Sequence, residues 1–460
     1  MIFDNGRRRL YRDAVANENR YRKEVPVLSH PDRRTPVVLL VGVQGPVADG
    51  MDHIARLLGA APGTVVVRHD LSSLREGVVR RRVRLDGRET VSVHELAHGC
   101  VSCTLRADLL PLLCRLAARD SVRRIVIALD PAFEAEAVCH AIDSVPVVDM
   151  VGRVDGPAGR DVRIEAVVTG LDARSWPADA LSDETVDERA GGPGDDDRTV
   201  AQLAVGQVEF ADALVVFAAD QVRDAERDVV RAVVDRLVPR APSIWAGDGR
   251  DIAAARIEML LDRIPADSRR GRVFDAHAPL LRGRPPLVAE HGVALIEFAA
   301  ARPFHPTRLH EALDVLFEGV ITARGRIWLA TQPERVVWLE SAGGGLRVGD
   351  AGRWLAAMSP AELACVDPDR RALATLRWDE DFGDRDISLV ILTCGADADE
   401  IRTALHWALL DEAEMILLRN APDLVAHWAD PFGEFHEDPC ETTQSDNPGG
   451  RGVDSRPNER

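Results

Sequence analysis

The sequence predicts a two-domain α/β protein, in which a doubly wound, mostly parallel sheet precedes a small α+β domain. Over the first half of the chain, short apolar runs rich in β-branched residues alternate with helix-length segments, a pattern typical of parallel strands covered on both faces. Shorter strands bounded by turn residues follow in the second half. With 460 residues, of which 46% are hydrophobic, the chain is long enough for two cores.

In the first domain, each element is predicted from its own pattern. A polar, arginine-rich arm ends near Thr35, and the first buried strand starts at Pro36. Gly45 and Pro46 then turn the chain into a helix. The predicted order is strand 36–43, helix 52–60, strand 63–71, helix 105–120, and strands 122–130, 163–171 and 211–220, followed by helix 221–238 and strand 243–247.

The second domain is predicted from a strand that runs into a helix, several short strands and a closing helix. These elements are strand and helix 293–317, strands 327–332, 336–344, 345–350 and 387–395, and helix 398–410. The predicted organisation is a flexible basic arm 1–35, an α/β domain 36–270, a linker 271–290, a second domain 291–430 and a disordered tail 431–460.

Charge and composition limit the classes of function. A formal net charge of -18 argues against a protein that wraps bare DNA or RNA. No segment has the length and apolarity of a membrane span, and the N-terminus has no run resembling a signal peptide. Seven cysteines in so long a chain do not make a disulfide framework, which suits a reducing compartment. We therefore expect a cytoplasmic protein.

Several motifs resemble the CobW family. The segments RPFHPTRLHEALD, GRIWLATQ, SAGGGLRVGDAGRWLAA and FGDRDISLVILTCG are similar to the CobW C-terminal domain, and VSVHELAHGCVSCTLRADLLPLL resembles the family's cysteine segment ahead of a helix. The resemblance covers about residues 36–430 and implies a P-loop-type fold with GTP and Mg²⁺ in the first domain. The cysteine segment, the motif RPFHP and the segment GRPPL together look closest to an actinobacterial branch of the family. That branch consists of zinc-responsive GTPases that recruit a ribosome hibernation factor to the ribosome.

The P-loop of the family is only partly present. A P-loop needs glycines to cradle phosphates, a lysine on the β- and γ-phosphates and a hydroxyl on Mg²⁺. Gly42 and Gly45 keep the glycines, but Val47, Ala48 and Asp49 stand where the resemblance implies a third glycine, the lysine and the hydroxyl. A carboxylate at that last position repels phosphate. The sequence therefore predicts vestigial nucleotide binding.

The guanine-recognition motif is equally changed. The sequence Phe217-Ala-Ala-Asp220 occupies the place of Asn-Lys-x-Asp, which leaves only Asp220 to meet a guanine edge. Asp130, at a strand end, is either a Walker-B-like carboxylate or a helix cap. The one lysine of the chain is Lys23, in the arm, so it replaces neither missing lysine. We expect a pseudo-GTPase.

Cys100 and Cys103 form the candidate metal site. They precede Thr104, a plausible N-cap for the helix that begins at Leu105, and the positive end of that helix favours the thiolates that metals need. Two thiolates at this spacing suit one tetrahedral Zn²⁺.

Other ligands must complete that site, because Ser102 replaces one cysteine of the family motif. The candidates are His98 together with Glu95 or His94. A redox dithiol, or two thiols packed under a helix, are the alternatives to zinc.

A basic hairpin is predicted from the sequence LREGVVRRRVRLDGR. Arg80, Arg81, Arg82 and Arg84 would either be solvated or contact an acidic partner or RNA. The pair His69-Asp70 lies where the resemblance implies acidic switch residues, and we interpret it instead as the cap of a turn at a strand end. His305 and His310 are interpreted as packing residues at a helix start, with metal binding as the alternative. Side chains in apolar runs are assigned to the core, namely Cys114, Cys139, Cys365, Cys394 and Trp407.

Three functions remain as hypotheses. The first, implied by the branch resemblance, is a zinc-responsive adaptor that recruits a ribosome hibernation factor to the ribosome. The second is a zinc metallochaperone that hydrolyses GTP. The third is a zinc-binding or storage protein without a ribosomal partner. The missing P-loop lysine and hydroxyl favour the first over the second, and the second domain and basic patches disfavour the third.

Overall fold

The computed structural model describes residues 32–42, 46–96, 104–130, 133–190, 198–274, 276–281 and 283–433. The predicted basic arm lies outside these ranges apart from residues 32–35, and the predicted tail lies outside them apart from residues 431–433. Within the described residues, no helix is long and apolar enough to cross a membrane.

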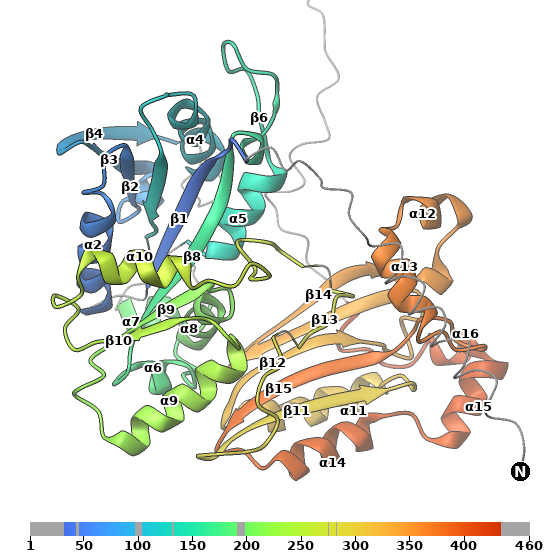
Figure 1. The fold of residues 1–460 in the computed structure, drawn as a ribbon. Coiled ribbons are helices and arrows are strands. Elements are labelled where there is room, and N and C mark those ends of the chain that lie inside the picture. The colour runs from blue at the N-terminus through green and yellow to red at the C-terminus, as the bar shows by residue number, and fades with distance from the viewer. Residues whose placement is uncertain are drawn as a thin grey trace, which may run out of the picture.

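The first domain is built on a sheet that has eight strands in the described residues, in the order β10-β9-β8-β1-β5-β2-β3-β4. Neighbours from β10 to β2 are parallel, whereas β3 and β4 add an antiparallel hairpin at one edge (Figure 1). This confirms the predicted mostly parallel sheet. The strands are β1 Thr35–Gly42, β2 Thr64–Asp70, β3 Val78–Leu85, β4 Arg88–Glu95, β5 Arg124–Ala128, β8 Val162–Asp172, β9 Ala213–Phe217 and β10 Ser243–Trp245, with a separate pair β6 Pro146–Val147 and β7 Gly156–Pro157.

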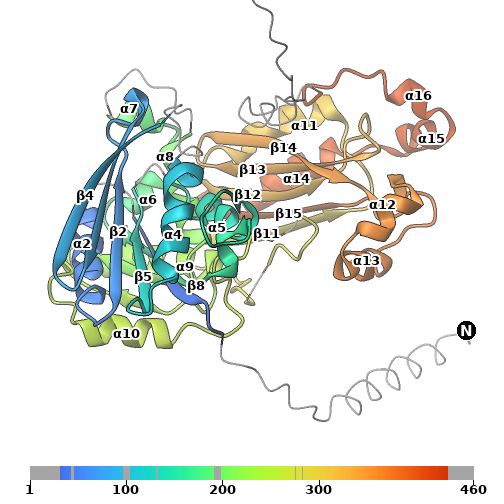
Figure 2. The ribbon, with the colours of Figure 1, turned by 90° about the horizontal axis from the view of Figure 1, so that it is seen from above.

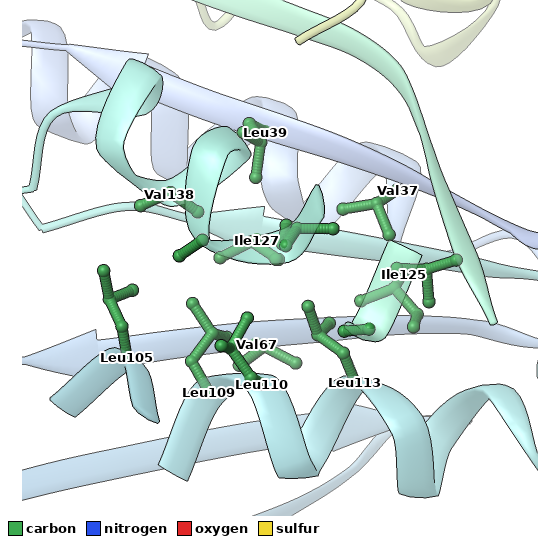
Figure 3. Packing of buried hydrophobic residues seen from close by; sticks show 14 of the residues in the cluster. Val37, Leu39, Val67, Leu105, Leu109, Leu110, Leu113, Ile125, Ile127 and Val138 are labelled. Carbon is green, nitrogen blue, oxygen red and sulfur yellow. The ribbon is translucent and has the colours of Figure 1, made fainter. Parts of the chain in front are cut away.

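Helices cover both faces of this sheet, as a doubly wound fold requires (Figure 2). One face packs against α2 and α10, and the other against α4, α5, α8 and α9. Figure 3 shows the core between α4, α5 and the central strands, to which alternate β1 residues such as Val37 and Leu39 contribute together with Leu109 and Leu113 of the helix. The helices are α2 Pro46–Leu58, α4 Leu110–Ala117, α5 Ala135–Ser144, α6 Trp176–Asp179, α7 Val186–Ala190, α8 Val200–Glu209, α9 Asp224–Leu237 and α10 Ala254–Asp262.

The predicted helix 105–120 starts differently from the expectation. Its first turn, Leu105–Leu109, is π-helical, and α4 continues from it. Thr104 has helical angles, φ -60° and ψ -44°, and its side chain does not cap the helix. An N-cap needs an extended backbone to aim its side-chain oxygen at the first free N–H groups. The N-cap prediction was therefore wrong.

The second domain is a five-stranded antiparallel sheet in the described residues, ordered β11-β15-β12-β13-β14. One face packs on α11 and α14, and the other face packs on α8 and α9 of the first domain. Helices α8 and α9 are thus a layer that both sheets share. The elements are β11 Val293–Ala300, α11 Pro306–Ala312, β12 Val320–Ile327, β13 Arg335–Ala342, β14 Gly345–Arg353, α12 Pro360–Cys365, α13 Pro368–Thr375, β15 Ile387–Cys394, α14 Ala398–Ala408, α15 Glu412–Asn420 and α16 Pro422–Val425.

Two expectations for the second domain were wrong. Residues 328–332 are not part of a regular strand. Leu329 makes only an isolated parallel bridge to Phe304, and Trp328 and Leu329 are buried, which accounts for the apolar run. Cys365 is exposed on α12, which has no buried residue, and Trp407 is 53% exposed. Trp407 lies off the buried stripe of α14, which is formed by Ile401, Leu405 and Ala408.

The segment expected to be a linker packs between the domains. Arg236 on α9 donates to the carbonyl oxygen of Val288 at 2.5 Å and pairs with Glu290 at 3.1 Å. Leu281 packs on the shared core, and the ring of His277 meets that of Trp354 at 5.8 Å.

Candidate functional site

The candidate nucleotide residues follow strands at the carboxyl end of the parallel sheet, where ligands bind in doubly wound folds. Gly42 is the last residue of β1, and Asp130 follows β5 by two residues. Asp220 follows β9 and is exposed. Gly45 lies outside the described residues. Gly42, Asp130 and Asp220 thus all lie at the carboxyl ends of parallel strands.

Side chains of α2 fill the space directly above the ends of β1 and β8. Val47 and Met51 are only 3% and 5% exposed. A Cβ atom on Gly42 would lie 2.7 Å from Val47 Cγ1, and one on Gly170 would lie 2.7 Å from Met51 Sδ. The first turns of α2 therefore rest directly on the backbone of two strands. The carboxylate of Asp49 is exposed on the first turn of α2, where the helix dipole favours negative charge.

Phe217 occupies the first position of the segment expected to recognise guanine. It is 3% exposed, and its ring lies directly against the backbone of Gly50 in α2. A Cβ atom on Gly249 would lie 2.5 Å from Phe217 Cε1. The ring thus fills the space between α2 and the loop after β10. Asp220 lies beside this loop, 3.0 Å from where a Cβ atom of Gly247 would stand.

Hydrogen bonds join the ends of β2 and β5. The backbone N–H of Leu71 donates to Asp130 Oδ2 at 3.2 Å. The backbone N–H of Ser72 donates to Asp70 Oδ1 at 3.1 Å. Hydrogen bonding from Ser72, by its side chain first and its backbone N–H second, lowers the pKa of Asp70. Asp70 therefore caps the turn after β2, as the sequence predicted. His69 instead contacts Asp108.

His69 belongs to a buried ionic cluster around Asp108, which we call the Asp108 cluster. His69 Nε2 lies 2.7 Å from Asp108 Oδ2, and the Arg81 guanidinium binds Asp108 Oδ1. His94 Nε2 lies 3.5 Å from the same Oδ1. The side chains of His69 and Asp108 are 1% and 3% exposed. One carboxylate on the π-helical turn thus joins the end of β2 to both strands of the β3–β4 hairpin.

The cluster favours the ionised form of Asp108. Burial alone would raise the pKa of this carboxyl group, but the hydrogen bond and charge of His69, together with Arg81 and His94, outweigh that effect. The pKa of Asp108 therefore lies below its ordinary value. With the guanidinium of Arg81 bound to its carboxylate, Asp108 is not available as a metal ligand.

Sequence reasoning missed the Asp108 cluster, although a signal was present. Asp108 directly precedes the apolar run LLPLL, and it lies on the side of the helix that the leucines bury. A carboxylate at a core position requires charged or donor partners. The search for those partners would have led to His69 and to one arginine of the hairpin.

The candidate metal segment lies between the two parts of the chain that the Asp108 cluster holds. Cys100, Cys103 and His98 lie outside the described residues, and Glu95 is the exposed last residue of β4. His94, the alternative to Glu95, precedes the segment, and Asp108 follows it. Both flanks of the cysteine segment are therefore anchored to one carboxylate. Within the described residues, no three or more His, Cys, Asp or Glu side chains are placed so that they could hold a metal ion.

The structure separates the four arginines that the sequence grouped as a partner contact. Arg80 and Arg82 are exposed and Arg84 is half-buried, all on one face of the hairpin. Arg81 points to the opposite face, where it binds Asp108. Because successive residues of a strand point to opposite faces, Arg81 cannot share a surface with its neighbours.

Comparisons with known proteins cover both domains. Residues 69–244 match the family model CobW/HypB/UreG, nucleotide-binding domain, and residues 293–409 match the cobalamin synthesis protein cobW C-terminal domain. A Mycobacterium tuberculosis protein named "Zinc chaperone Rv0106" is 46% identical over 411 residues, which are 88% of this chain and 95% of that protein.

A more distant relative and a solved structure also align with this chain. The "Zinc-regulated GTPase metalloprotein activator 1" of Dictyostelium discoideum is 24% identical over 76% of this chain and 72% of that protein. The Zn(II)-bound YjiA GTPase from E. coli aligns with 82% of this chain and 99% of its own at 13% identity and a TM-score of 0.34. The match to the M. tuberculosis protein and the two family models together define the family. The chain belongs to the CobW/HypB/UreG P-loop GTPase family, with a cobW C-terminal domain following its nucleotide-binding-type domain.

Proposed function

We propose that this protein is a zinc chaperone that holds Zn²⁺ as its cargo. The observation that carries the proposal is the 46% identity, over both domains, to a protein named as a zinc chaperone. A second relative is named "Zinc-regulated GTPase metalloprotein activator 1". These comparisons favour the metallochaperone hypothesis over the adaptor hypothesis that we preferred from the sequence.

The cysteine segment is the part of the chain best suited to the cargo. Cys100 and Cys103 supply two soft thiolates, and His98 with Glu95 supplies harder donors, a set that zinc accepts in tetrahedral sites. The Asp108 cluster supports the segment from both sides without competing for the metal, because its carboxylate is already bound by a guanidinium. Carboxylate or imidazole ligands beside two thiolates would leave zinc more exchangeable than a four-cysteine site does.

This proposal departs from the metallochaperone hypothesis drawn from the sequence in one respect, because it gives GTP turnover little part in zinc handling. Val47 and Met51 fill the space above the strand ends, Phe217 fills the base-recognition region, and Asp49 places a negative charge at the start of α2. The match to the nucleotide-binding family model begins at residue 69, in β2, after β1 and the whole of α2. We expect purified protein with Mg²⁺ and GTP to release phosphate no faster than the buffer. A GTP-dependent rate that Asp49→Arg abolishes would contradict this expectation.

Zinc-limited growth tests the proposed function directly. A strain that lacks the protein should grow more slowly than its parent when a zinc chelator is added, and added zinc should restore growth. A plasmid with the wild-type gene should rescue the strain, whereas Cys100→Ser with Cys103→Ser should not. Cys365→Ser, which removes an exposed thiol on α12, is the matched control and should rescue fully. Equal growth of mutant and parent across the chelator series would overturn the proposal.

Recruitment of a ribosome hibernation factor stays a second candidate function. The observation that favours it is the pair of exposed arginines, Arg80 and Arg82, on one face of the hairpin. Sedimentation of the protein with ribosomes from zinc-limited cells, and its loss when zinc is plentiful, would support it. If the protein never sediments with ribosomes or binds a purified hibernation factor, this function is excluded.

A further inference from the structure

A cavity of about 370 Å³ lies between the two domains. It is lined by α5 and α8 of the first domain, by the segment after α10, and by β12, β13 and β14 of the second domain. Two smaller hollows, of about 280 and 90 Å³, share lining residues with it. The described residues that line the cavity belong neither to the cysteine segment nor to the candidate nucleotide edge. Its volume is that of a site for a small organic molecule.

Arg269 presents a guanidinium group to this cavity without a carboxylate in contact. The guanidinium carbon lies 4.6 Å from the ring centre of Phe210 and 5.2 Å from that of Phe274, and it makes no ion pair with any described residue. Burial lowers the pKa of Arg269, and the carboxylate that opposes this effect most is Glu136. Glu136 is thus near enough to act on Arg269 but does not touch it. The two aromatic rings hold a cation whose N–H groups suit a carboxylate.

Two carboxylates that line the same cavity also lack a partner. Glu136 is exposed on α5 and Glu340 is half-buried on β13, and neither forms an ion pair within the described part of the chain. The other two carboxylates of the cavity are engaged, Glu209 with Arg324 at 2.5 Å and Asp350 with Arg335 at 3.3 Å. The cavity therefore offers both an uncompensated positive group and uncompensated negative groups.

The charges of the adjoining hollows do not change this balance. Arg272 and Arg347 border them without an ion pair in the described ranges, and so does Asp212, which accepts hydrogen bonds from two backbone N–H groups. The remaining charged side chains there are paired. Unpaired groups of both signs thus surround one connected space. A simple anion or cation would satisfy one sign and leave the other, whereas a zwitterion satisfies both.

A buried amide adds a third requirement. Gln207 on α8 is 3% exposed, and neither its Oε1 nor its Nε2 has a hydrogen-bond partner. It lines the 90 Å³ hollow, which shares Glu136, Glu209 and Glu340 with the main cavity. A buried amide without partners is unfavourable. A peptide group carries one N–H and one C=O, which are the two partners that Gln207 lacks.

We propose that the cavity between the domains binds a short peptide with both termini free. Its carboxylate binds Arg269, its ammonium group binds Glu136 and Glu340, and a peptide group meets Gln207. A single amino acid such as alanine has no amide for Gln207, and the described residues hold no group of side chains placed to bind a metal ion. This site is independent of zinc and of the proposed chaperone function.

Isothermal titration calorimetry with L-alanyl-L-alanine tests the proposal on the full-length protein. Wild-type protein should bind this dipeptide, and its unfolding temperature should rise with dipeptide concentration. Arg269→Gln and Glu136→Gln should each weaken binding by about tenfold, because each removes a charge-assisted hydrogen bond. Gln207→Leu should weaken binding by a smaller factor. Arg123→Gln and Glu297→Gln, at exposed positions outside the cavity, are the matched controls and should bind as wild type does.

Capped peptides test each terminus without any change to the protein. N-acetyl-L-alanyl-L-alanine lacks the ammonium group and L-alanyl-L-alaninamide lacks the carboxylate, so each should bind wild-type protein about tenfold more weakly than the free dipeptide. Zinc content should be the same in Arg269→Gln as in wild type, which separates this test from that of the chaperone function.

Four results would overturn the proposal. They are no binding of the dipeptide, equal binding of the capped peptides, unchanged binding in both Arg269→Gln and Glu136→Gln, and tighter binding of free alanine than of the dipeptide. The last result would assign the cavity to a single amino acid.

Discussion

Asp108 is the residue on which three strands of the first domain converge. Replacing it with asparagine leaves Arg81 and His69 in the interior without the carboxylate that balances them. Breaking such a buried pair costs about 3–5 kcal/mol, so Asp108→Asn should lower the free energy of unfolding by that amount in urea titrations. Asp143→Asn is the control, because burial already disfavours the charged form of that carboxyl group and raises its pKa. Equal stability of both variants would show that the cluster contributes nothing to the fold.

The depressed pKa of Asp108 also predicts how stability depends on pH. The pKa is lower in the folded than in the unfolded state, where it is about 3.8, so the cluster adds its full stability above that value. This contribution is lost as the pH falls below 3.8 and through the lower folded-state pKa. The difference in unfolding free energy between wild type and Asp108→Asn should therefore shrink as the pH falls through this range. A difference that grew on acidification would contradict the assignment.

Thiol reactivity should divide the cysteines by burial. Burial raises the pKa of the Cys114 thiol to about 11 and that of Cys139 further, so little of either is thiolate at neutral pH. Cys365 is exposed and should be alkylated by iodoacetamide within minutes in the native protein. Mass spectrometry of peptides after brief alkylation measures all three, with denatured protein as the reference. Fast labelling of Cys139 in the folded protein would contradict the packing of α5.

At the scale of elements, the pattern of apolar and polar residues in the sequence predicted most of the helices and strands. Apolar runs marked the parallel strands, and the arginine-rich segment formed the hairpin as expected. The same period of two in a strand also separates Arg81 from Arg80 and Arg82, a consequence that grouping by composition overlooked. The π-helical turn before α4 has no such pattern in the sequence, and the Asp108 that it carries binds partners from other elements. Residues 328–332 have the apolar pattern of a strand because Trp328, Leu329 and Ala330 are buried.

We expect helix α2 to stabilise the fold by packing on the strand ends and not to bind a nucleotide. Met51 is 5% exposed and lies on the end of β8, so Met51→Ala should cost about 2–5 kcal/mol of unfolding free energy. The cavity should not confer GTP binding, because Asp49 and Phe217 remain. Met259→Ala, at a methionine that is 52% exposed on α10, should change stability by less than about 0.5 kcal/mol. Similar losses in the two variants would contradict the packing described for α2.

At the scale of the molecule, the two domains share one apolar core. Helices α8 and α9 contact both sheets, and Ile321 of β12, which is 1% exposed, belongs to this shared core. Ile321→Ala should cost about 2–5 kcal/mol and lower the stability of both domains together, so calorimetry should show one transition. Ile416→Ala, at a 51% exposed site on α15, is the control. Two separate transitions, with only one shifted by Ile321→Ala, would contradict a shared core.

The arrangement of the domains was beyond what the sequence could predict. Apolar faces on α8, α9 and the second sheet are visible as patterns, but the patterns do not say which faces meet. For the candidate site, the carboxyl-end positions of Gly42, Asp130 and Asp220 followed from strand order alone. Val47, Met51 and Phe217 fill the space at the carboxyl ends of these strands, and this depends on three-dimensional packing. The cysteine segment stays a sequence prediction, because Cys100 and Cys103 lie outside the described residues.

Zinc content is the most direct test of the account. Purified protein, dialysed against a weak chelator, should retain about one Zn²⁺ per chain by elemental analysis. Cys100→Ser and Cys103→Ser should each lose most of this zinc, since a hydroxyl is a poor ligand beside a thiolate, and His98→Ala should weaken binding less. Cys365→Ser should retain full occupancy, and so should wild-type protein with or without Mg²⁺ and GTP. Full zinc content in Cys100→Ser, or no zinc in the wild type, would contradict the central claim that this segment carries the cargo.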